Sequence, residues 1–320
     1  MGCVPVAIRI AALGIVGLLS CAAARPPATL DKSFRLLSYT HQQTPRIALL
    51  HHPLSLGGRP APLVIALHGL GQSINGLRDW LRMDEAAERH GFNVVYPQAI
   101  ALSWSYGKPL ARPMPVVRGK TVDDIGFIRK MIDDLVAAGI ADPQHIYVTG
   151  MSRGGLMTFT LACALADRIA AAAPLITGMT DHQREDCHPA RALPLMAVAG
   201  TSDRSETYDG AVAPKGRLLS VQETMDFWRE IDGCRDEISQ ALPHLHESDP
   251  TSVRRVEWQN CKSDTNLMLY RVNNGGHQLP SFVESSKDDS VHFGPRNRDI
   301  DTAEAVWDFF SRFSDWMASN

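Results

Sequence analysis

The strongest constraint on the fold is a glycine-flanked serine, Gly-Met-Ser-Arg-Gly at residues 150–154, which stands between two apolar segments. Residues 146–149 are rich in β-branched and aromatic side chains and predict a strand, while residues 155–161 are compatible with a helix. A serine on a sharp turn between strand and helix projects its hydroxyl into a cleft, and flanking glycines relieve the crowding of that turn. A helix N-cap serine is the alternative, but it needs neither the glycines nor the strand. The pattern predicts a nucleophile elbow with Ser152 at its tip.

A nucleophilic serine needs a base that accepts its proton and an acid that orients this base. Asp203 and His277 each follow an apolar run that predicts a strand, and His277 lies directly after two glycines. In hydrolases that use a nucleophile elbow, the chain order is serine, acid, histidine, and these residues occur in that order. We therefore predict a triad of Ser152, Asp203 and His277. Asp209, in a nearby Tyr-Asp-Gly turn, is a rival for the acid.

Attack on a carbonyl creates an oxyanion, which backbone N–H groups commonly stabilise. One donor is predicted at Arg153, the residue after the nucleophile. The other is expected from the glycine-rich turn that follows an early apolar strand at 63–67. Leu70 is favoured within that turn, while Gly69 and Gly71 are the alternatives.

The chain resembles a known family, the secreted esterases of the polyhydroxybutyrate depolymerase, feruloyl esterase and acetylxylan esterase type, within the α/β-hydrolases. The resemblance extends over about residues 62–310. It is carried by residues 67–69, 122–127, 146–155, 200–203, 275–277 and 299–303. It implies an α/β-hydrolase fold and a serine esterase with Ser152, Asp203 and His277 as its triad.

Three positions depart from the pattern of this family. The family often has Cys where this chain has Leu70, and Asn or Ala where this chain has the cationic Arg153. Its histidine loop usually continues to Trp-Pro, whereas residues 278–280 are Gln-Leu-Pro here. All three changes fall around expected substrate contacts, so they predict a difference in substrate and leave the chemistry intact.

The order of the predicted elements indicates an α/β protein. Apolar strands are predicted at 46–50, 63–67, 93–96, 146–149, 171–176, 195–199 and 267–272. Helices are predicted at 79–90, 122–138, 153–166, 219–231 and 302–316. Continuous apolar strands alternating with helices predict a mostly parallel central sheet with helices on both faces. The even alternation across 320 residues predicts a single catalytic domain over residues 30–320.

The first 24 residues predict an export signal. Arg9 precedes a short apolar run at 10–19 that is bounded by small residues. Residues 18–21, Leu-Leu-Ser-Cys, further resemble a bacterial lipobox, in which Cys21 would be lipidated and attach the protein to a membrane. Cleavage after the alanines at 22–24 is the alternative and would release a soluble exported enzyme.

Four cysteines remain once Cys3 and Cys21 are set aside, and an even number in an exported chain predicts disulfides. Of the three possible pairings, we expect the two that join cysteines close in sequence. These pairs are Cys163 with Cys187, and Cys234 with Cys261. The alternative is four free thiols in the core.

Several other polar residues have structural interpretations. His68 is expected to pack behind the oxyanion turn. Asp123 and Asp124 could form an acid–base pair, but at a helix start they are expected to cap the helix and favour its dipole. His244 and His246 are interpreted as surface-loop residues and not as a metal site, and no cysteine spacing suggests zinc.

The sequence predicts a serine esterase that needs no cofactor and acts on small or oligomeric carboxylic esters. Feruloyl or acetyl esters of polysaccharide and short hydroxyalkanoate oligomers are the expected substrates, with the loops at 280–298 and 103–118 at the cleft. A net charge of −3 without a basic cluster argues against nucleic acid as a partner. The alternatives are a non-catalytic binding protein on a hydrolase scaffold, and a peptidase or acyltransferase that uses the same triad. The sequence does not predict an oligomeric state.

Overall fold

The computed structural model describes residues 32–110, 113–283 and 289–313, which form one compact unit. The predicted export signal and the Cys21 lipidation site lie outside the described residues. Within these described ranges, no helix combines the length and the apolar character that a membrane crossing requires.

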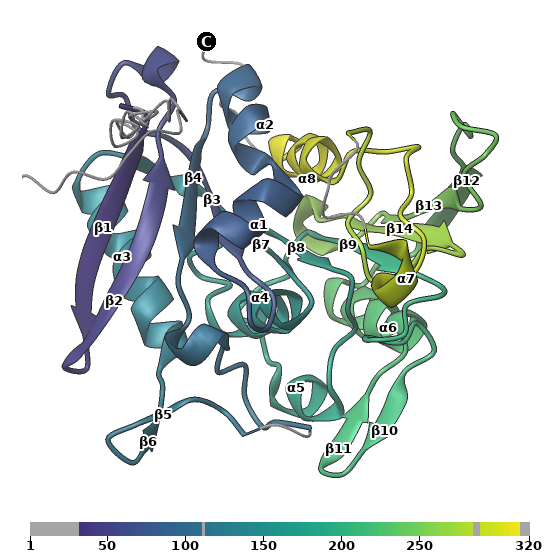
Figure 1. Cartoon of the computed structure of the whole chain (residues 1–320), viewed down its shortest axis with the longest axis horizontal. Helices are drawn as coiled ribbons and strands as arrows, with labels where there is room; N and C mark the ends of the chain where they lie inside the picture. The colour runs from purple at the N-terminus through teal and green to yellow at the C-terminus, as the bar shows by residue number, and fades with distance from the viewer. Residues whose placement is uncertain (1–31, 111–112, 284–288, 314–320) are drawn as a thin grey trace, which may run out of the picture. The chain divides into compact units, whose positions relative to one another are not determined.

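A ten-stranded sheet forms the centre of the fold (Figure 1). The strands β4, β3, β7, β8, β9 and β14 run parallel, while β1, β2, β13 and β12 add antiparallel pairs at the two edges. Across the sheet the order is β1 (Phe34–His41), β2 (Thr44–His51), β4 (Asn93–Pro97), β3 (Ala61–Leu67), β7 (Ala141–Met151), β8 (Ala171–Leu175), β9 (Leu195–Gly200), β14 (Leu267–Asn273), β13 (Ser252–Gln259) and β12 (Asp236–Ala241). The mostly parallel sheet predicted from the sequence is confirmed, and all the strands it predicted are present.

Both faces of the sheet are covered by helices, which explains why its inner strands read as continuous apolar runs. Every residue of β3 is buried. Its side chains alternate between two hydrophobic clusters, with Leu63 and Ile65 in one and Val64 and Ala66 in the other. The first cluster includes residues of α3 (Asp124–Ala137), α4 (Arg153–Ala164) and α6 (Val221–Asp232); the second includes residues of α1 (Ile74–Leu81), α2 (Met83–His90) and α8 (Thr302–Ser311) (Figure 1).

Some helix boundaries differ from the prediction. The single helix predicted at 79–90 is wrong, because Arg82 adopts a left-handed conformation with φ 55° and separates α1 from α2. Helix α8 ends at Ser311, and residues 314–316 of the predicted helix lie outside the described ranges. The sequence also missed the antiparallel strands β1, β12 and β13 at the sheet edges. Several short elements were missed as well: α5 (Asp181–Asp186), α7 (Ser290–Phe293), the hairpins β5–β6 (Val116–Val117, Lys120–Thr121) and β10–β11 (Ala211–Ala213, Gly216–Leu218), and the 3₁₀ turns η1 (Leu54–Leu56), η2 (Ile100–Leu102) and η3 (Lys262–Asp264).

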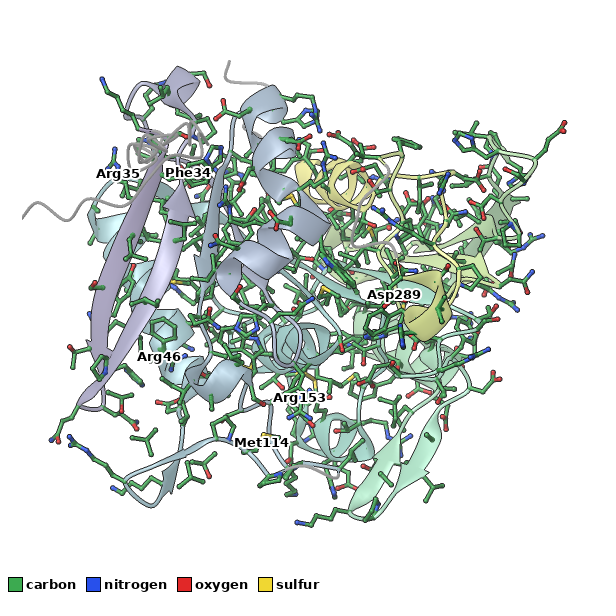
Figure 2. The ribbon with its side chains drawn as sticks, viewed as in Figure 1. Phe34, Arg35, Arg46, Met114, Arg153 and Asp289 are labelled. Carbon is green, nitrogen blue, oxygen red and sulfur yellow. A yellow bond between two sulfur atoms is a disulfide. The ribbon has the colours of Figure 1, made fainter. Side chains whose placement is uncertain are left out.

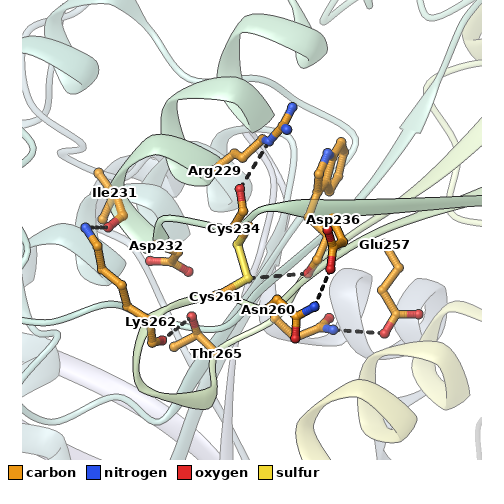
Figure 3. The surroundings of a disulfide bond; sticks show 12 residues. Arg229, Ile231, Asp232, Cys234, Asp236, Glu257, Asn260, Cys261, Lys262 and Thr265 are labelled. Carbon is orange, nitrogen blue, oxygen red and sulfur yellow. Dashed lines mark hydrogen bonds between the residues drawn. A yellow bond between two sulfur atoms is a disulfide. The ribbon is translucent and has the colours of Figure 1, made fainter.

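Two disulfides join neighbouring elements, and both predicted pairings are confirmed. Cys163 in α4 is bonded to Cys187 after α5, with a sequence separation of 24 residues. Cys234 after α6 is bonded to Cys261 after β13, with a separation of 27 residues (Figure 3). The alternative of four free thiols is therefore wrong. Loops of this length give each bond about 3 kcal/mol of stabilisation by the chain-entropy estimate.

Asp232 is a buried carboxyl at the end of α6, two residues before Cys234 (Figure 3). It is fully buried, and its Oδ1 accepts a hydrogen bond of 3.1 Å from the Leu193 N–H. Burial disfavours the ionised form and raises the pKa of Asp232 to about 7, against the opposing effect of that hydrogen bond.

We predict that Asp232→Asn stabilises the protein increasingly as pH rises. The pKa of Asp232 is higher in the folded chain than in the unfolded chain, so the stability it contributes is complete below about pH 4 and is lost as pH rises towards 7. The variant lacks this loss. Its free energy of unfolding, relative to that of the wild type, should therefore rise by about 1–3 kcal/mol between pH 4 and pH 8. Urea unfolding at several pH values measures this difference, and Asp226→Asn at an exposed position of the same helix is the control. A stability difference that stays constant with pH would contradict the prediction.

Candidate active site

Ser152 occupies a strained turn between β7 and α4. Its backbone angles are φ 54° and ψ −121°, which residues with a side chain rarely adopt, and its N–H donates a 2.9 Å hydrogen bond to the Leu175 carbonyl. The flanking glycines are required sterically. A Cβ on Gly154 would collide with the Leu67 carbonyl, and one on Gly150 would lie 2.6 Å from the Gly154 carbonyl oxygen. The strand, turn and helix expected of a nucleophile elbow are therefore present.

Asp203 and His277 are in direct contact beyond the ends of β9 and β14. The His277 Nδ1 lies 2.6 Å from Asp203 Oδ2, and both side chains are buried. The carboxylate accepts at Oδ2, so Nδ1 carries the hydrogen and Nε2 is left as the basic nitrogen. Asp203 Oδ1 accepts the backbone N–H groups of Ser205 and Glu206 at 2.8 and 2.9 Å, which fix the carboxylate. Asp209 is exposed and makes no hydrogen bond to His277 within the described chain.

The sheet brings these residues to one edge. Ser152 follows β7, Asp203 follows β9 and His277 follows β14, and the three strands run parallel in the order β7-β8-β9-β14. Carboxyl ends of parallel strands meet at the same edge of a sheet, where ligands bind in open α/β sheets. Ser152 and His277 make no hydrogen bond to each other among the described residues; such bonds often tighten only when substrate is bound.

The loop that carries His277 is held by the segment around α7. The N–H groups of Gly276 and His277 donate to the carbonyls of Pro295 at 2.8 Å and Phe293 at 2.5 Å. A Cβ on Gly276 would collide with the Phe293 carbonyl, so the close approach requires glycine. The Phe293 ring also lies 6.2 Å from the His277 ring and 6.1 Å from Trp80 of α1. Residues 293–295, within the segment 280–298 that was expected at the cleft, thus support the histidine loop, and Phe293 adds an aromatic ring beside His277.

Hydrogen bonds within the early glycine-rich turn separate the three oxyanion candidates. The Gly69 N–H donates to Gln72 Oε1 at 2.9 Å, and the Gly71 N–H donates to a carbonyl in η2 at 2.9 Å. The Leu70 N–H has no acceptor among the described residues. Arg153 is the first residue of α4, so its N–H has no partner within the helix. The geometry therefore favours Leu70 over its neighbours as the partner of Arg153 in an oxyanion hole.

His68 supports this turn from behind, as the sequence predicts. It is fully buried, and its Nε2 accepts the Ala99 N–H at 3.1 Å, which places the hydrogen on Nδ1 for donation to the Gly69 carbonyl at 2.8 Å. Burial lowers the pKa of His68 and keeps the ring neutral. The Trp104 indole N–H donates to the His68 carbonyl at 2.9 Å and links the turn to the loop at 103–118.

The two aspartates at the start of α3 have different roles. Asp123 caps the helix by accepting the Gly126 N–H at 2.8 Å, as predicted. The expectation that Asp124 also caps is wrong. Asp124 is buried and pairs with Arg46 Nη2 at 2.6 Å, and it accepts the Ser105 N–H at 2.7 Å. The Asp124 carboxylate therefore ties α3 to β2 and to the loop that follows η2.

The Arg153 side chain lies at the same end of α4 as Ser152 (Figure 2). Its Nη1 donates to the Ser103 hydroxyl at 3.0 Å, and its guanidinium carbon lies 5.2 Å from the centre of the Tyr106 ring. Both partners belong to the segment that follows η2, so the side chain of Arg153 joins this segment to the start of α4.

Glu206 is a functional candidate that the sequence did not indicate. Its Oε2 lies 3.4 Å from the Thr177 hydroxyl, and its carboxyl interacts electrostatically with Asp203, His277 and Arg153. Burial raises the pKa of Glu206 to about 7, and the Asp203 charge adds to this rise while His277 and Arg153 oppose it. The sequence contains no pattern for this contact, because the turn after Asp203 alone brings Glu206 back to the site.

His244 and His246 are exposed loop residues, as interpreted from the sequence, and His244 Nδ1 lies 3.0 Å from Asp299 Oδ2. Across the ranges that the structure describes, no group of three or more histidine, cysteine or acidic side chains could hold a metal ion.

The chain is similar in sequence to proteins named as esterases. The chain is 26% identical over 260 residues to NocK of Nocardia uniformis subsp. tsuyamanensis, a protein named as an esterase, with 78% of this chain and 73% of that protein covered. It is 27% identical over 234 residues to feruloyl esterase B of Piromyces equi, with 69% of this chain covered. Because only 40% of that second relative is covered, the chain spans less than half of its length. No model of a known protein family matches the chain.

The fold is also found among solved structures. The acetyl xylan esterase from Aspergillus awamori matches with a TM-score of 0.56, covering 88% of this chain and 100% of that chain at 15% sequence identity. At this identity the match establishes the fold. The predicted fold and the predicted resemblance to proteins named as esterases are therefore confirmed.

Proposed function

We propose that the protein hydrolyses carboxylic esters with Ser152 as nucleophile, His277 as base and Asp203 as the acid that orients it. The observation that carries the proposal is the strained serine turn at the same sheet edge as a buried, hydrogen-bonded histidine–aspartate pair. The relatives named as esterases support the same reaction class.

The mechanism follows from the position of the hydrogen on His277, which is carried by Nδ1 and leaves Nε2 free to accept a proton. His277 Nε2 takes the Ser152 proton as the hydroxyl attacks the ester carbonyl, and Asp203 stabilises the imidazolium that forms. The N–H groups of Leu70 and Arg153 hold the oxyanion of the tetrahedral intermediate. Proton return from His277 releases the alcohol and leaves an acyl-enzyme. Water activated by the same histidine then releases the acid, so these residues complete the reaction without a cofactor.

The proposed substrates are feruloyl or acetyl esters of polysaccharide and short hydroxyalkanoate oligomers. The names of the Piromyces and Aspergillus proteins support the first class, and the sequence resemblance supports both.

We further propose that the protein is exported, because its two disulfides are typical of oxidising compartments and its first 24 residues resemble an export signal. Lipid attachment at Cys21 and release as a soluble enzyme are the two forms that export would allow.

Replacement of the nucleophile tests the proposal most directly. We expect a fluorophosphonate probe to label the wild type and not Ser152→Ala, and the variant should hydrolyse p-nitrophenyl butyrate about 10³-fold more slowly or worse. Ser38→Ala, at an exposed position of β1, is the matched control and should behave like the wild type. A wild type that neither reacts with the probe nor cleaves esters would favour a binding protein. Faster cleavage of peptide amides than of ethyl ferulate would favour a peptidase.

The choice between the two acids is tested by a pair of substitutions. Asp203→Asn should lower kcat by about 10³-fold, because an amide neither fixes the required tautomer of His277 nor stabilises its cation. Asp209→Asn should leave kcat within about twofold, since this side chain is exposed and does not bond to the histidine. Steady-state kinetics with p-nitrophenyl butyrate measure both. The reverse pattern would assign the role to Asp209.

The position of Glu206 near His277 predicts that its charge changes kcat/KM as pH rises. Its pKa is about 7, so it becomes negatively charged near His277 as pH rises and should then stabilise the imidazolium of the transition state. With a neutral ester, kcat/KM of Glu206→Gln should match the wild type at pH 5.5 and fall about threefold below it at pH 8. Parallel pH profiles of the two proteins would show that Glu206 does not act on the histidine.

A further inference from the structure

The Arg153 side chain places a positive charge where a helix normally attracts negative charge. Arg153 is the first residue of the 12-residue helix α4, and the first turn contains no acidic residue. The helix dipole is positive at this end, and it favours anions there and disfavours a cation. The residue after Ser152 therefore carries a positive charge that no acidic side chain of this helical turn balances.

The guanidinium is held in a defined position by a buried support. Ser103 is 7% exposed and Tyr106 is 3% exposed; the first accepts the Arg153 Nη1–H at 3.0 Å and the second presents its ring at 5.2 Å. The intervening loop is fixed by the Ser105 N–H, which donates to the buried Asp124. Little side-chain freedom remains to be lost when a ligand binds, which favours recognition at this group.

Most donors of this guanidinium are unused. Within the described part of the chain, Ser103 accepts its single side-chain hydrogen bond, and no carboxylate forms an ion pair with Arg153 within 4.0 Å. An arginine side chain has five N–H donors in a planar fork that matches the two oxygens of a carboxylate. The unused donors can therefore bind an anionic group of that shape.

Glu206 lies close enough to interact with Arg153 electrostatically, but the two do not form an ion pair. Burial raises the pKa of Glu206 to about 7. Below this pH its carboxyl is mostly uncharged, so the positive charge of Arg153 is not cancelled by its neighbour.

We propose that Arg153 selects substrates by binding a carboxylate on the ester itself, so that the enzyme prefers esters with a free carboxylate to their neutral counterparts. This inference rests on the proposed esterase function and narrows its substrate class. The backbone N–H of the same residue is the proposed oxyanion donor, so the carboxylate should be separated from the reacting carbonyl by only a few atoms. Monoesters of short diacids and hydroxyalkanoate oligomers with a free acid end fit this requirement, whereas esters of neutral polysaccharide do not.

Matched ester pairs at pH 6.5 test the proposal. Monoethyl and diethyl adipate differ only in a carboxylate on the acyl part. The ester 4-butyryloxybutanoate and its methyl ester differ only in a carboxylate on the alcohol part. For at least one pair, the wild type should have the higher kcat/KM with the anionic ester. In Arg153→Gln the ratio of the anionic to the neutral kcat/KM should fall about tenfold, because the KM for the anionic ester rises. Arg153→Lys, which keeps the charge without the fork, should recover part of it.

The outcomes separate this inference from the proposed function. If the wild type neither hydrolyses p-nitrophenyl butyrate nor reacts with the fluorophosphonate probe, the esterase proposal fails. If it does either but prefers neither anionic ester to its neutral partner, the carboxylate site is wrong. If it cleaves neutral esters but the preference is unchanged in Arg153→Gln, or if the variant loses both members of each pair equally, the carboxylate site is wrong and the esterase proposal stands. The wild type also gives a readout that needs no variant. Raising the salt concentration from about 0.02 to 0.5 M should reduce kcat/KM for the preferred anionic ester several-fold more than for its neutral partner, and equal effects would overturn the proposal.

Discussion

The close approach of α4 to β3 is the constraint on which the site depends. Gly154 packs against the Leu67 carbonyl at a distance that excludes any side chain, and Gly150 packs against Gly154 itself. This contact brings the start of α4 to the turn that follows β3. Ser152 is thereby held in its strained conformation, and the N–H groups of Arg153 and Leu70 come from the two elements that meet there. One packing contact between backbones thus positions both the proposed nucleophile and the groups proposed to stabilise charge.

The second half of the site depends on hydrogen bonds between loops and not on packing within the sheet. His277 is oriented by Asp203 on one side and by the carbonyls around α7 on the other. Its loop also contains Gly276, where a side chain would collide with Phe293. The histidine therefore has little freedom before substrate binds, which lowers the cost of reaching a reactive arrangement. Ser152 and His277 are fixed by separate contacts, so the proposed mechanism requires their hydrogen bond to form when substrate binds.

The inner strands and the residues at their ends were predictable from the sequence because burial on both faces leaves an unbroken apolar signal. Strand β12 was not, since all six of its residues are exposed and its sequence has no burial pattern. The break between α1 and α2 was missed because Arg82 is not a residue type that marks a left-handed turn. Glu206 could not be found for a different reason: its place near His277 depends on the path of a turn, which no local pattern records.

The residues proposed for the chemistry and those proposed for the selectivity come from different parts of the chain. Ser152, Asp203 and His277 all follow strands of the parallel part of the sheet. The aromatic ring of Phe293 and the support of the Arg153 side chain come instead from α7 and from the loop after η2. Connecting segments tolerate change better than a packed sheet does. Proteins that share this sheet can therefore retain one reaction while their loops adapt it to different esters.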